Sequence, residues 1–207
     1  NIERSENVEL VAGCSRSVEN RSWVEEHYDP KYTTPRAEQV FADPDVDMAI
    51  LSVPHSVHFE LMIQAIEAGK HVLAEKPMTM TVDESYQVCK AVKDAGVKLC
   101  VDYNRRFAPS MLHLREQYHQ HRENPEVGEG QFIDTPDRPR WPEEDTTMLM
   151  IRINDESSTY RPVHIDWRTG GGQIIGETCH WLDLACWIFD AEPTRVYASG
   201  SSRLNHI

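Results

Sequence analysis

Short apolar runs alternate with amphipathic stretches through the first half of the chain. The runs are bounded by polar residues and rich in Val, Ile and Leu, as strands buried on both faces of a sheet would be. They cover residues 8–14, 46–53, 71–74 and 97–101. The stretches between them, 18–28, 35–43, 59–68 and 78–94, are predicted to be helices. This alternation predicts an α/β fold with a doubly wound parallel sheet and right-handed crossovers.

The second half of the chain has a less regular pattern. Helices are predicted at 110–121 and in the apolar stretch that ends at Phe189. Short strands are expected at 130–133, 147–153, 163–167 and 195–198, and the last of these would open an antiparallel sheet. The change of pattern divides the chain into two predicted domains, residues 1–105 and residues 106–207.

Two charged residues follow the short apolar run 71–74 directly. Glu75 and Lys76 would lie at the carboxyl end of a parallel strand, the edge at which open α/β sheets bind ligands. Pro77 favours an extended conformation at Lys76, which holds the ammonium out at the strand end. The alternative is an ordinary exposed Glu–Lys pair before a turn, which would contribute little.

Composition excludes several classes of partner. A net charge of −13 argues against binding to nucleic acid or to an anionic membrane surface. No apolar run approaches the ~20 residues that span a bilayer. The five cysteines are odd in number and lie mostly inside apolar runs, which indicates reduced, buried thiols and a cytoplasmic location. The first residue is Asn1, so we expect further residues upstream.

The segment Gly69-Lys-His-Val-Leu-Ala-Glu-Lys-Pro77 resembles the signature of the glucose–fructose oxidoreductase/inositol dehydrogenase (Gfo/Idh/MocA) family. The resemblance implies a Rossmann-type domain that binds NAD or NADP, with Glu75 and Lys76 beside the nicotinamide. It also implies that Lys76 contacts the substrate oxygen, and that the Lys76–Pro77 peptide bond is cis. Residues 106–207 would be part of an α+β substrate domain with a mostly antiparallel sheet.

Ser15 and Arg16 follow the first predicted strand, where a dinucleotide fold meets the adenosine ribose. An acidic residue there binds the 2′-hydroxyl of NAD, whereas an Arg accommodates the 2′-phosphate of NADP. The absence of an acidic residue gives a slight preference for NADP. The same pair is also ordinary turn chemistry.

Two further segments resemble cofactor contacts of the family. Pro54, His55 and His58 follow the strand at 46–53, and Asn104 opens an Asn-Arg-Arg-Phe segment that would lie near the nicotinamide ribose. A plain helix-capping turn is the alternative for the first, and pairing of the arginines with surface acids for the second. No metal is expected, because His55 and His58 lack further ligands at matching spacing.

A glycine-rich turn, 170–176, leads into the apolar helix that ends at Phe189. It is not read as a dinucleotide phosphate loop, because no long buried strand precedes it. It resembles the second motif of the family, in which His180 would be the proton-transfer residue. Gly176 stands where the family has Asp, with Glu177 next to it as a candidate substrate contact. Trp167 resembles an aromatic residue that lines the substrate site.

These features predict an NAD(P)-dependent oxidoreductase acting on a sugar, a sugar derivative or a cyclitol. His180 would take the hydroxyl proton, Lys76 would hold the oxygen and Glu75 would orient Lys76. The alternative is a non-catalytic, dinucleotide-binding regulatory or scaffold relative, which Gly176 favours. The family's first strand and Gly-x-Gly-x-x-Gly turn are not found, so the chain by itself is expected to be inactive. The longer protein is expected to form a homo-oligomer.

Overall fold

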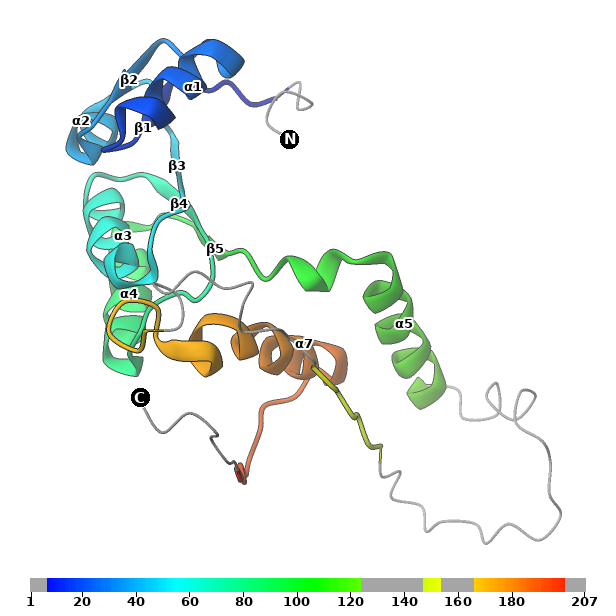
Figure 1. Cartoon of the computed structure of the whole chain (residues 1–207). Coiled ribbons are helices and arrows are strands. Elements are labelled where there is room, and N and C mark those ends of the chain that lie inside the picture. Colours follow the sequence, from blue (N-terminus) through cyan, green and yellow to red (C-terminus); the bar gives the residue numbers. More distant parts are fainter. Residues whose placement is uncertain (1–6, 124–146, 154–165, 200–207) are drawn as a thin grey trace, which may run out of the picture. The chain divides into compact units, whose positions relative to one another are not determined.

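The computed structural model describes residues 7–123, 147–153 and 166–199 (Figure 1). The chain forms two compact units, each of which takes two segments. The first unit comprises Asn1–Tyr103 and Asn154–Cys179, and the second comprises Asn104–Ile153 and His180–Ile207. The first boundary lies close to the one expected at residue 105, but the glycine-rich turn belongs to the first unit. The assignment of 1–105 and 106–207 to separate domains stays a prediction.

The first unit contains parallel strands joined by helices, as expected. Its elements are β1 (Ala12–Cys14), α1 (Val18–Tyr28), β2 (Tyr32–Thr34), α2 (Ala37–Ala42), β3 (Met48–Leu51), α3 (His58–Glu67), β4 (His71–Ala74), α4 (Val82–Ala95) and β5 (Leu99–Val101). β1 pairs with β2, and β3, β4 and β5 form a second sheet in that order; every pairing is parallel. Helices α3 and α4 lie on the same side of this sheet (Figure 1). Sequential strands joined by right-handed crossovers require this arrangement.

The core of the first unit lies between the β3–β5 sheet and its helices. The largest fully buried side chains are Met62, Ile66, His58 and Val88. Burying an aliphatic side chain of this size contributes about 1.5–3 kcal/mol. Gly69 ends the turn between α3 and β4 with a φ of 77°, a left-handed conformation that glycine adopts without strain. β4 therefore starts at a defined point and delivers Glu75 and Lys76 to its carboxyl end.

Several predicted boundaries were wrong. Helix α4 begins at Val82 rather than near residue 78, because Thr81 and Glu84 form a capping box. The Thr-x-x-Glu spacing was visible in the sequence. Strand β2 was missed, since its three residues are too few to show a pattern. β1, β3 and β5 are shorter than predicted, whereas α1 and β4 have the predicted bounds.

The described part of the second unit contains α5 (Pro109–Glu123) and most of α7 (Cys179–Phe189). The Arg115 guanidinium donates a hydrogen bond of 3.0 Å to the Trp187 carbonyl oxygen. The Tyr118 and Phe189 rings meet edge to face with centroids 5.0 Å apart. These contacts join the second half of α7 to the middle of α5.

Two of the predicted strands do not form. Residues 147–153 and 195–198 lie within the described ranges and have no strand structure. Val196 and Tyr197 are 86% and 92% exposed, so neither pairs nor packs as a strand residue would. The predicted strand at 130–133 and most of that at 163–167 lie outside the described residues. The antiparallel sheet therefore stays a prediction.

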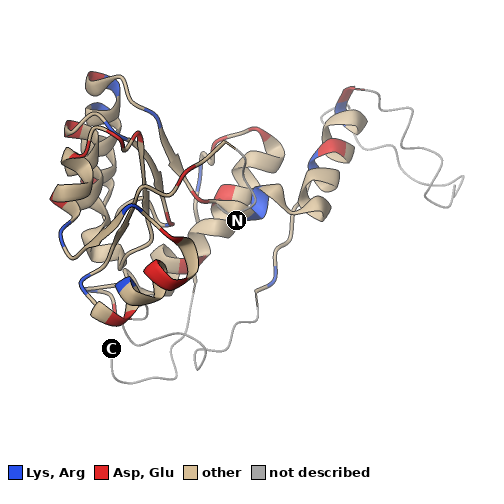
Figure 2. Cartoon of the chain, turned by 90° about the horizontal axis from the view of Figure 1, so that it is seen from above, with Lys and Arg blue, Asp and Glu red and all other residues tan. Residues whose placement is uncertain are grey.

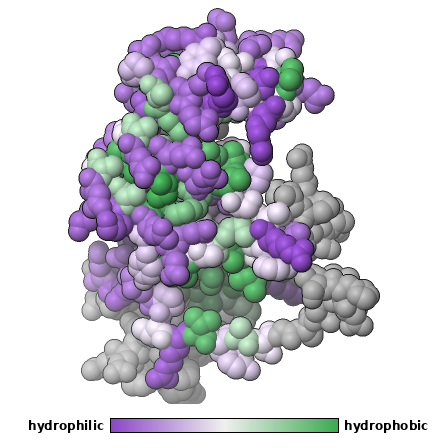
Figure 3. Space-filling view, turned by 90° about the vertical axis from the view of Figure 1, so that its left-hand side faces the viewer, coloured by the Kyte–Doolittle hydropathy of each residue, from purple (hydrophilic) through white to green (hydrophobic). Residues whose placement is uncertain are grey.

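Surface properties of the described residues match the composition only in part. Lys and Arg are scattered among Asp and Glu along the described elements (Figure 2). Hydrophilic side chains cover most of the face shown in Figure 3, around smaller hydrophobic areas. None of the described helices is long and apolar enough to cross a membrane.

The expectation of buried thiols was wrong, because Cys14, Cys89 and Cys100 are exposed. Apolar sequence neighbours do not bury a side chain that points off the packed face.

Candidate functional site

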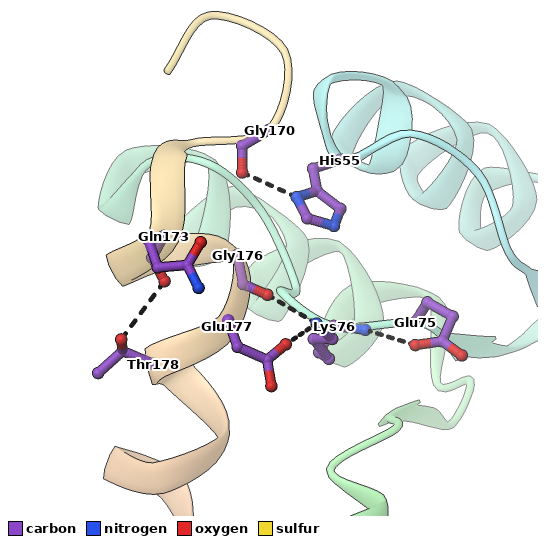
Figure 4. Close-up of polar contacts among 8 residues, drawn as sticks. All are labelled: His55, Glu75, Lys76, Gly170, Gln173, Gly176, Glu177 and Thr178. Carbon is purple, nitrogen blue, oxygen red and sulfur yellow. Dashed lines mark hydrogen bonds and ion pairs between the residues drawn. The ribbon is translucent and has the colours of Figure 1, made fainter. Parts of the chain in front are cut away.

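Lys76 lies just past the end of β4 and is held by a distant segment of the same unit. The Glu75 N–H donates a hydrogen bond of 2.9 Å to the Leu51 carbonyl oxygen, which continues the pairing with β3. The Lys76–Pro77 peptide bond is cis, as expected. The Lys76 ammonium donates to the Gly176 carbonyl oxygen at 2.7 Å and to a Glu177 carboxylate oxygen at 2.9 Å (Figure 4). The ion pair is largely shielded, since the two side chains are only 19% and 14% exposed.

Glu75 does not orient this ammonium, contrary to the sequence-based expectation. Its carboxylate accepts a hydrogen bond of 3.3 Å from the backbone N–H of Lys76 (Figure 4). The ammonium itself is positioned by Glu177, which the sequence analysis assigned to the substrate. A partly buried ion pair fixes its partners more firmly than an exposed one, because solvent screens it less.

The glycine-rich turn reaches Lys76 through an irregular helix start. Residues Ile174–Thr178 form a π-helical turn that runs directly into α7. Gly176 and Glu177 both lie in this turn. A π turn closes its hydrogen bonds over five residues instead of four and is often found at functional sites. An α-helical spacing therefore does not describe the step from Glu177 to His180.

The turn that follows β3 is fastened to the same segment. The Nδ1 atom of His55 donates a hydrogen bond of 2.8 Å to the Gly170 carbonyl oxygen (Figure 4). The backbone N–H of Ser56 donates one of 3.2 Å to the Thr169 carbonyl oxygen. Residues more than a hundred positions apart in the sequence thus meet at the carboxyl edge of β3 and β4.

A cavity of about 210 Å³ opens at this edge. Its lining combines an ammonium, two carboxylates, an imidazole and glycine backbone: Ser52, Val53, His55, Glu75, Lys76, Gly172, Gln173, Gly176 and Glu177. An ammonium has three N–H donors, and two of those of Lys76 meet acceptors among the described residues. The third can donate to an oxygen atom in the cavity.

His58 has a different position from the one expected for a cofactor contact. It is fully buried, with Nδ1 2.8 Å from the Pro77 carbonyl oxygen and Nε2 3.0 Å from the Val53 carbonyl oxygen. A buried side chain with both nitrogens against backbone cannot face a ligand. It instead ties the end of β3 to the segment after Lys76. Pro54 precedes the 3-10 turn His55–Val57 between these groups.

Ser15 and Arg16 lie where the sequence places them, at the carboxyl end of β1. Ser15 accepts a hydrogen bond of 3.3 Å from the Ser17 N–H, and Arg16 is exposed. The Arg21 guanidinium donates to the carbonyl oxygens of Ser15 and Arg16 at 2.6 and 3.2 Å. Arg21 was not singled out in the sequence analysis, because nothing in its helical position marks it as a turn contact.

Asn104 and His180 belong to the second unit. Asn104 is exposed and opens the 3-10 helix Asn104–Phe107. Arg106 of this helix forms a bidentate ion pair with Asp183 of α7. The Arg105 guanidinium lies 4.2 Å from the centroid of the Trp181 ring. His180 is buried, at 5% exposure. Because Lys76 lies in the first unit, its convergence with His180 and Asn104 stays a prediction.

Trp167 lies in the first unit outside the cavity lining. Its side chain is 62% exposed, and the Arg168 guanidinium lies 5.2 Å from its ring centroid.

Within the described ranges, no group of His, Cys, Asp and Glu side chains is arranged to hold a metal ion. The cavity residues missed by the sequence analysis are Ser52, Val53, Gly172 and Gln173. A motif in one segment cannot reveal which residues of another segment will face it.

Family models match both parts of the chain. One, described as the oxidoreductase family with an NAD-binding Rossmann fold, matches residues 1–103, and the Gfo/Idh/MocA C-terminal domain matches residues 145–206. The chain belongs to the Gfo/Idh/MocA oxidoreductase family. The sequence resemblance is thereby confirmed, as is the Rossmann-like parallel sheet of the first unit.

Individual relatives of this family extend well beyond the matched region. The chain is 32% identical to the uncharacterized oxidoreductase YrbE of Bacillus subtilis over 186 residues, which are 89% of this chain and 47% of the relative. It is 31% identical to the scyllo-inositol 2-dehydrogenase (NADP⁺) IolW of Bacillus subtilis over 154 residues, 74% of this chain and 36% of the relative. The chain thus spans half or less of the length of these Gfo/Idh/MocA relatives.

A solved structure supports the fold alone. The myo-inositol 2-dehydrogenase from Lactobacillus plantarum superimposes with a TM-score of 0.65 at 18% identity. The match covers 90% of this chain and 50% of that protein.

Proposed function

We propose that this chain carries the reaction centre of an NAD(P)-dependent oxidoreductase that acts on a hydroxyl group of a sugar, a sugar derivative or a cyclitol. The observation that carries the proposal is the shielded Lys76 ammonium, held by Glu177 and Gly176 in a cavity at the carboxyl edge of β3 and β4. The name of the scyllo-inositol 2-dehydrogenase relative from Bacillus subtilis supports a cyclitol or a similar polyol as substrate.

Lys76 would bind the oxygen atom of the reacting hydroxyl. The two hydrogen bonds to Gly176 and Glu177 set the direction of its third N–H. An oxygen atom of the substrate placed along that direction would therefore meet a donor that is already oriented. A preorganised positive charge stabilises the negative charge that develops on this oxygen as the C–H bond breaks. Glu177 would keep the ammonium in place, so that little reorganisation is needed during the reaction.

His180 would accept the proton of that hydroxyl as its carbon loses a hydride. Imidazole suits this role because it can take up a proton near neutral pH. The cavity lies at the sheet edge where α/β folds bind nucleotides, and its donors and acceptors fit a nicotinamide. Bound NAD(P)⁺ would supply the hydride acceptor. Ser15, Arg16, Pro54, His55, Glu75, Lys76 and Asn104 are the proposed cofactor contacts, and Arg16 favours NADP.

The test is reduction of NAD⁺ and NADP⁺ by the purified full-length protein with a panel of sugars and inositols. Lys76→Ala should lower turnover on an accepted substrate by about 10²–10³-fold, the effect of removing one oxyanion-stabilising donor. Lys90→Ala is a matched control, because this lysine is exposed and pairs with Asp94 on the same helix. Wild-type turnover by Lys76→Ala would refute the proposed mechanism.

The second candidate is a non-catalytic dinucleotide-binding relative. Gly176, in place of the family Asp, favours it, whereas the Glu177 carboxylate beside Lys76 argues for a working site. Cofactor binding by calorimetry, with no turnover of any polyol in the panel, would support this alternative. A homo-oligomeric parent protein is a further proposal, which sedimentation of the full-length protein tests.

A further inference from the structure

A guanidinium that the proposed function does not use holds the turn between β1 and α1. Arg21 lies in the first turn of α1, where its backbone N–H donates a hydrogen bond of 3.3 Å to the Ser17 carbonyl oxygen. Its Nη1 atom donates hydrogen bonds of 2.6 Å to the Ser15 carbonyl oxygen and 3.2 Å to the Arg16 carbonyl oxygen. Both of these oxygens therefore face a cation. Because the C=O and N–H of a trans peptide unit point in opposite directions, the N–H groups of Arg16 and Ser17 point away from the guanidinium.

The Ser15 hydroxyl group in the same turn has only its proton left to offer a ligand. Its Oγ atom accepts a hydrogen bond of 3.3 Å from the Ser17 N–H and one of 3.4 Å from the Asn20 side-chain amide. A hydroxyl oxygen has two acceptor positions, and both are thus occupied. No acceptor for its proton occurs among residues 7–123, 147–153 and 166–199. The oxygens of a 2′-phosphate only accept, whereas a residue that recognises the 2′-hydroxyl of NAD must accept from it. The hydroxyl therefore fits a phosphate.

We propose that Arg21 is a positioning residue for the 2′-phosphate of NADP: it binds the carbonyl oxygens of Ser15 and Arg16, so that the turn presents only donors to the phosphate. This rests on the proposed function, which assigns Ser15 and Arg16 to the cofactor and gives Arg21 no part. Without the guanidinium, either carbonyl group would be free to turn towards the phosphate and repel it. The neutral 2′-hydroxyl of NAD meets no such repulsion, so the effect should concern NADP alone.

The first test is calorimetric titration of the full-length protein with adenosine 2′,5′-bisphosphate and with 5′-AMP, which differ only by the 2′-phosphate. The wild type should bind the bisphosphate more tightly. Arg21→Ala should weaken binding of the bisphosphate about tenfold, the effect of one hydrogen bond to a charged group, and leave binding of 5′-AMP unchanged. Arg36→Ala, at an exposed position beside α2, is the matched control and should bind both as the wild type does.

Three results of this titration would overturn the proposal. An equal loss for the two nucleotides in Arg21→Ala would show that Arg21 only supports the structure of the turn. Unchanged affinities in Arg21→Ala would show that its two hydrogen bonds have no influence on the ligand. A wild-type protein without preference for the bisphosphate would show that the turn does not recognise a 2′-phosphate.

The second test separates positioning from direct contact with the phosphate. In NMR spectra of the full-length protein, adding adenosine 2′,5′-bisphosphate should shift the side-chain ¹⁵N signals of Arg16 and leave those of Arg21 in place, because the Arg21 guanidinium stays on the two carbonyl oxygens. Shifts of equal size at both residues would show that Arg21 touches the phosphate. No shift at Arg16 would show that the phosphate does not reach the turn. Either result would overturn the proposal.

Both measurements are independent of turnover, so this proposal and the proposed function fail separately. Loss of the preference for the bisphosphate in Arg21→Ala, in a protein that oxidises no polyol, would support the role of Arg21 and refute the oxidoreductase. Polyol oxidation with an unchanged ratio of kcat/KM for NADP⁺ and NAD⁺ in Arg21→Ala would overturn the role of Arg21 and leave the oxidoreductase intact.

Discussion

The carboxyl ends of β1 and β4 carry equivalent predicted roles but are built differently. At β1, the Ser15 N–H donates a hydrogen bond of 3.1 Å to the Thr34 carbonyl oxygen of the neighbouring strand, and the side-chain contacts of this turn come from Ser17 and Arg21. Arg16 is exposed. At β4, Lys76 is shielded and held by Gly176 and Glu177, a hundred positions further along the chain. The comparison shows that the exposed Arg16 side chain would have to be ordered when a ligand binds, whereas the Lys76 ammonium at the β4 edge is already held in position. Variants at β4 should therefore have the larger effects.

The largest expected effect at the β4 edge is on stability. His58→Ala removes a fully buried ring that faces the carbonyl oxygens of Val53 and Pro77. We expect a loss of about 2–4 kcal/mol in the free energy of unfolding, from the cavity and the unpaired carbonyls. Urea unfolding followed by circular dichroism measures it. His27→Ala, at an exposed site on α1, is the control and should change little. Equal stability of the two variants would show that His58 does not tie the edge together.

The next effect concerns the ammonium of Lys76. Glu177→Gln keeps the shape of the side chain but removes the charge that positions the ammonium. We expect kcat/KM for an accepted polyol to fall about 10–100-fold, because the Lys76 ammonium would no longer be held in its reactive position. The protein should remain folded. Glu67→Gln, at an exposed site on α3, should retain full activity. If Glu177→Gln matches this control, Lys76 does not depend on the ion pair.

At the β1 edge, the effect should be smaller and confined to one cofactor. Arg16→Ala should weaken NADP⁺ binding about tenfold through the loss of one charge-assisted hydrogen bond, and leave NAD⁺ binding unchanged. Calorimetric titration of the full-length protein with both cofactors is the measurement. Arg36→Ala, an exposed arginine beside α2, should behave as wild type. An equal loss for both cofactors would remove the basis for the NADP preference.

The smallest effect is the pH dependence near the β1–β2 sheet. Burial, with a hydrogen bond of 2.8 Å to Asp43, raises the pKa of Tyr32 to about 12. In the unfolded chain this pKa is about 10, so the stabilisation is complete below pH 10 and disappears as the pH rises towards 12. Tyr32→Phe should remove this alkaline loss of stability while slightly destabilising the protein at neutral pH. Urea unfolding of the wild-type and Tyr32→Phe proteins between these two pH values measures the free energy of unfolding of each. An equal loss of stability in both proteins would contradict this account.

The sequence predicted the β4 edge well because its signals are local. The apolar run 71–74, Gly69 before it and Pro77 after it each act within a few residues, and β4 has the predicted bounds. Lys76 and Glu177 were both named, but their ion pair was not predicted. It depends on a π-helical turn at Ile174–Thr178, and α-helical periodicity cannot reveal such a turn. The close approach of the His55 ring to Gly176, where an added Cβ atom would lie 3.2 Å from the His55 Cε1 atom, likewise arises only in three dimensions.

The predicted strands at 147–153 and 195–198 failed for a related reason. Their β-branched and aromatic residues favour a strand only when another strand pairs with them, and no such partner occurs among residues 7–123, 147–153 and 166–199. Local propensity at Val196 and Tyr197 therefore gave no strand. The parallel strands β3, β4 and β5 were predicted correctly because each is joined to the next by a helix that places the two strands side by side.

The most direct test of the central claim is a double-variant cycle on kcat/KM of the full-length protein, with Lys76→Met, His180→Gln and their combination. If both side chains act on the same hydroxyl, the combined loss should be close to that of the more damaging single variant. Losses that multiply would show that the two residues act independently, and the proposed reaction centre would then be wrong.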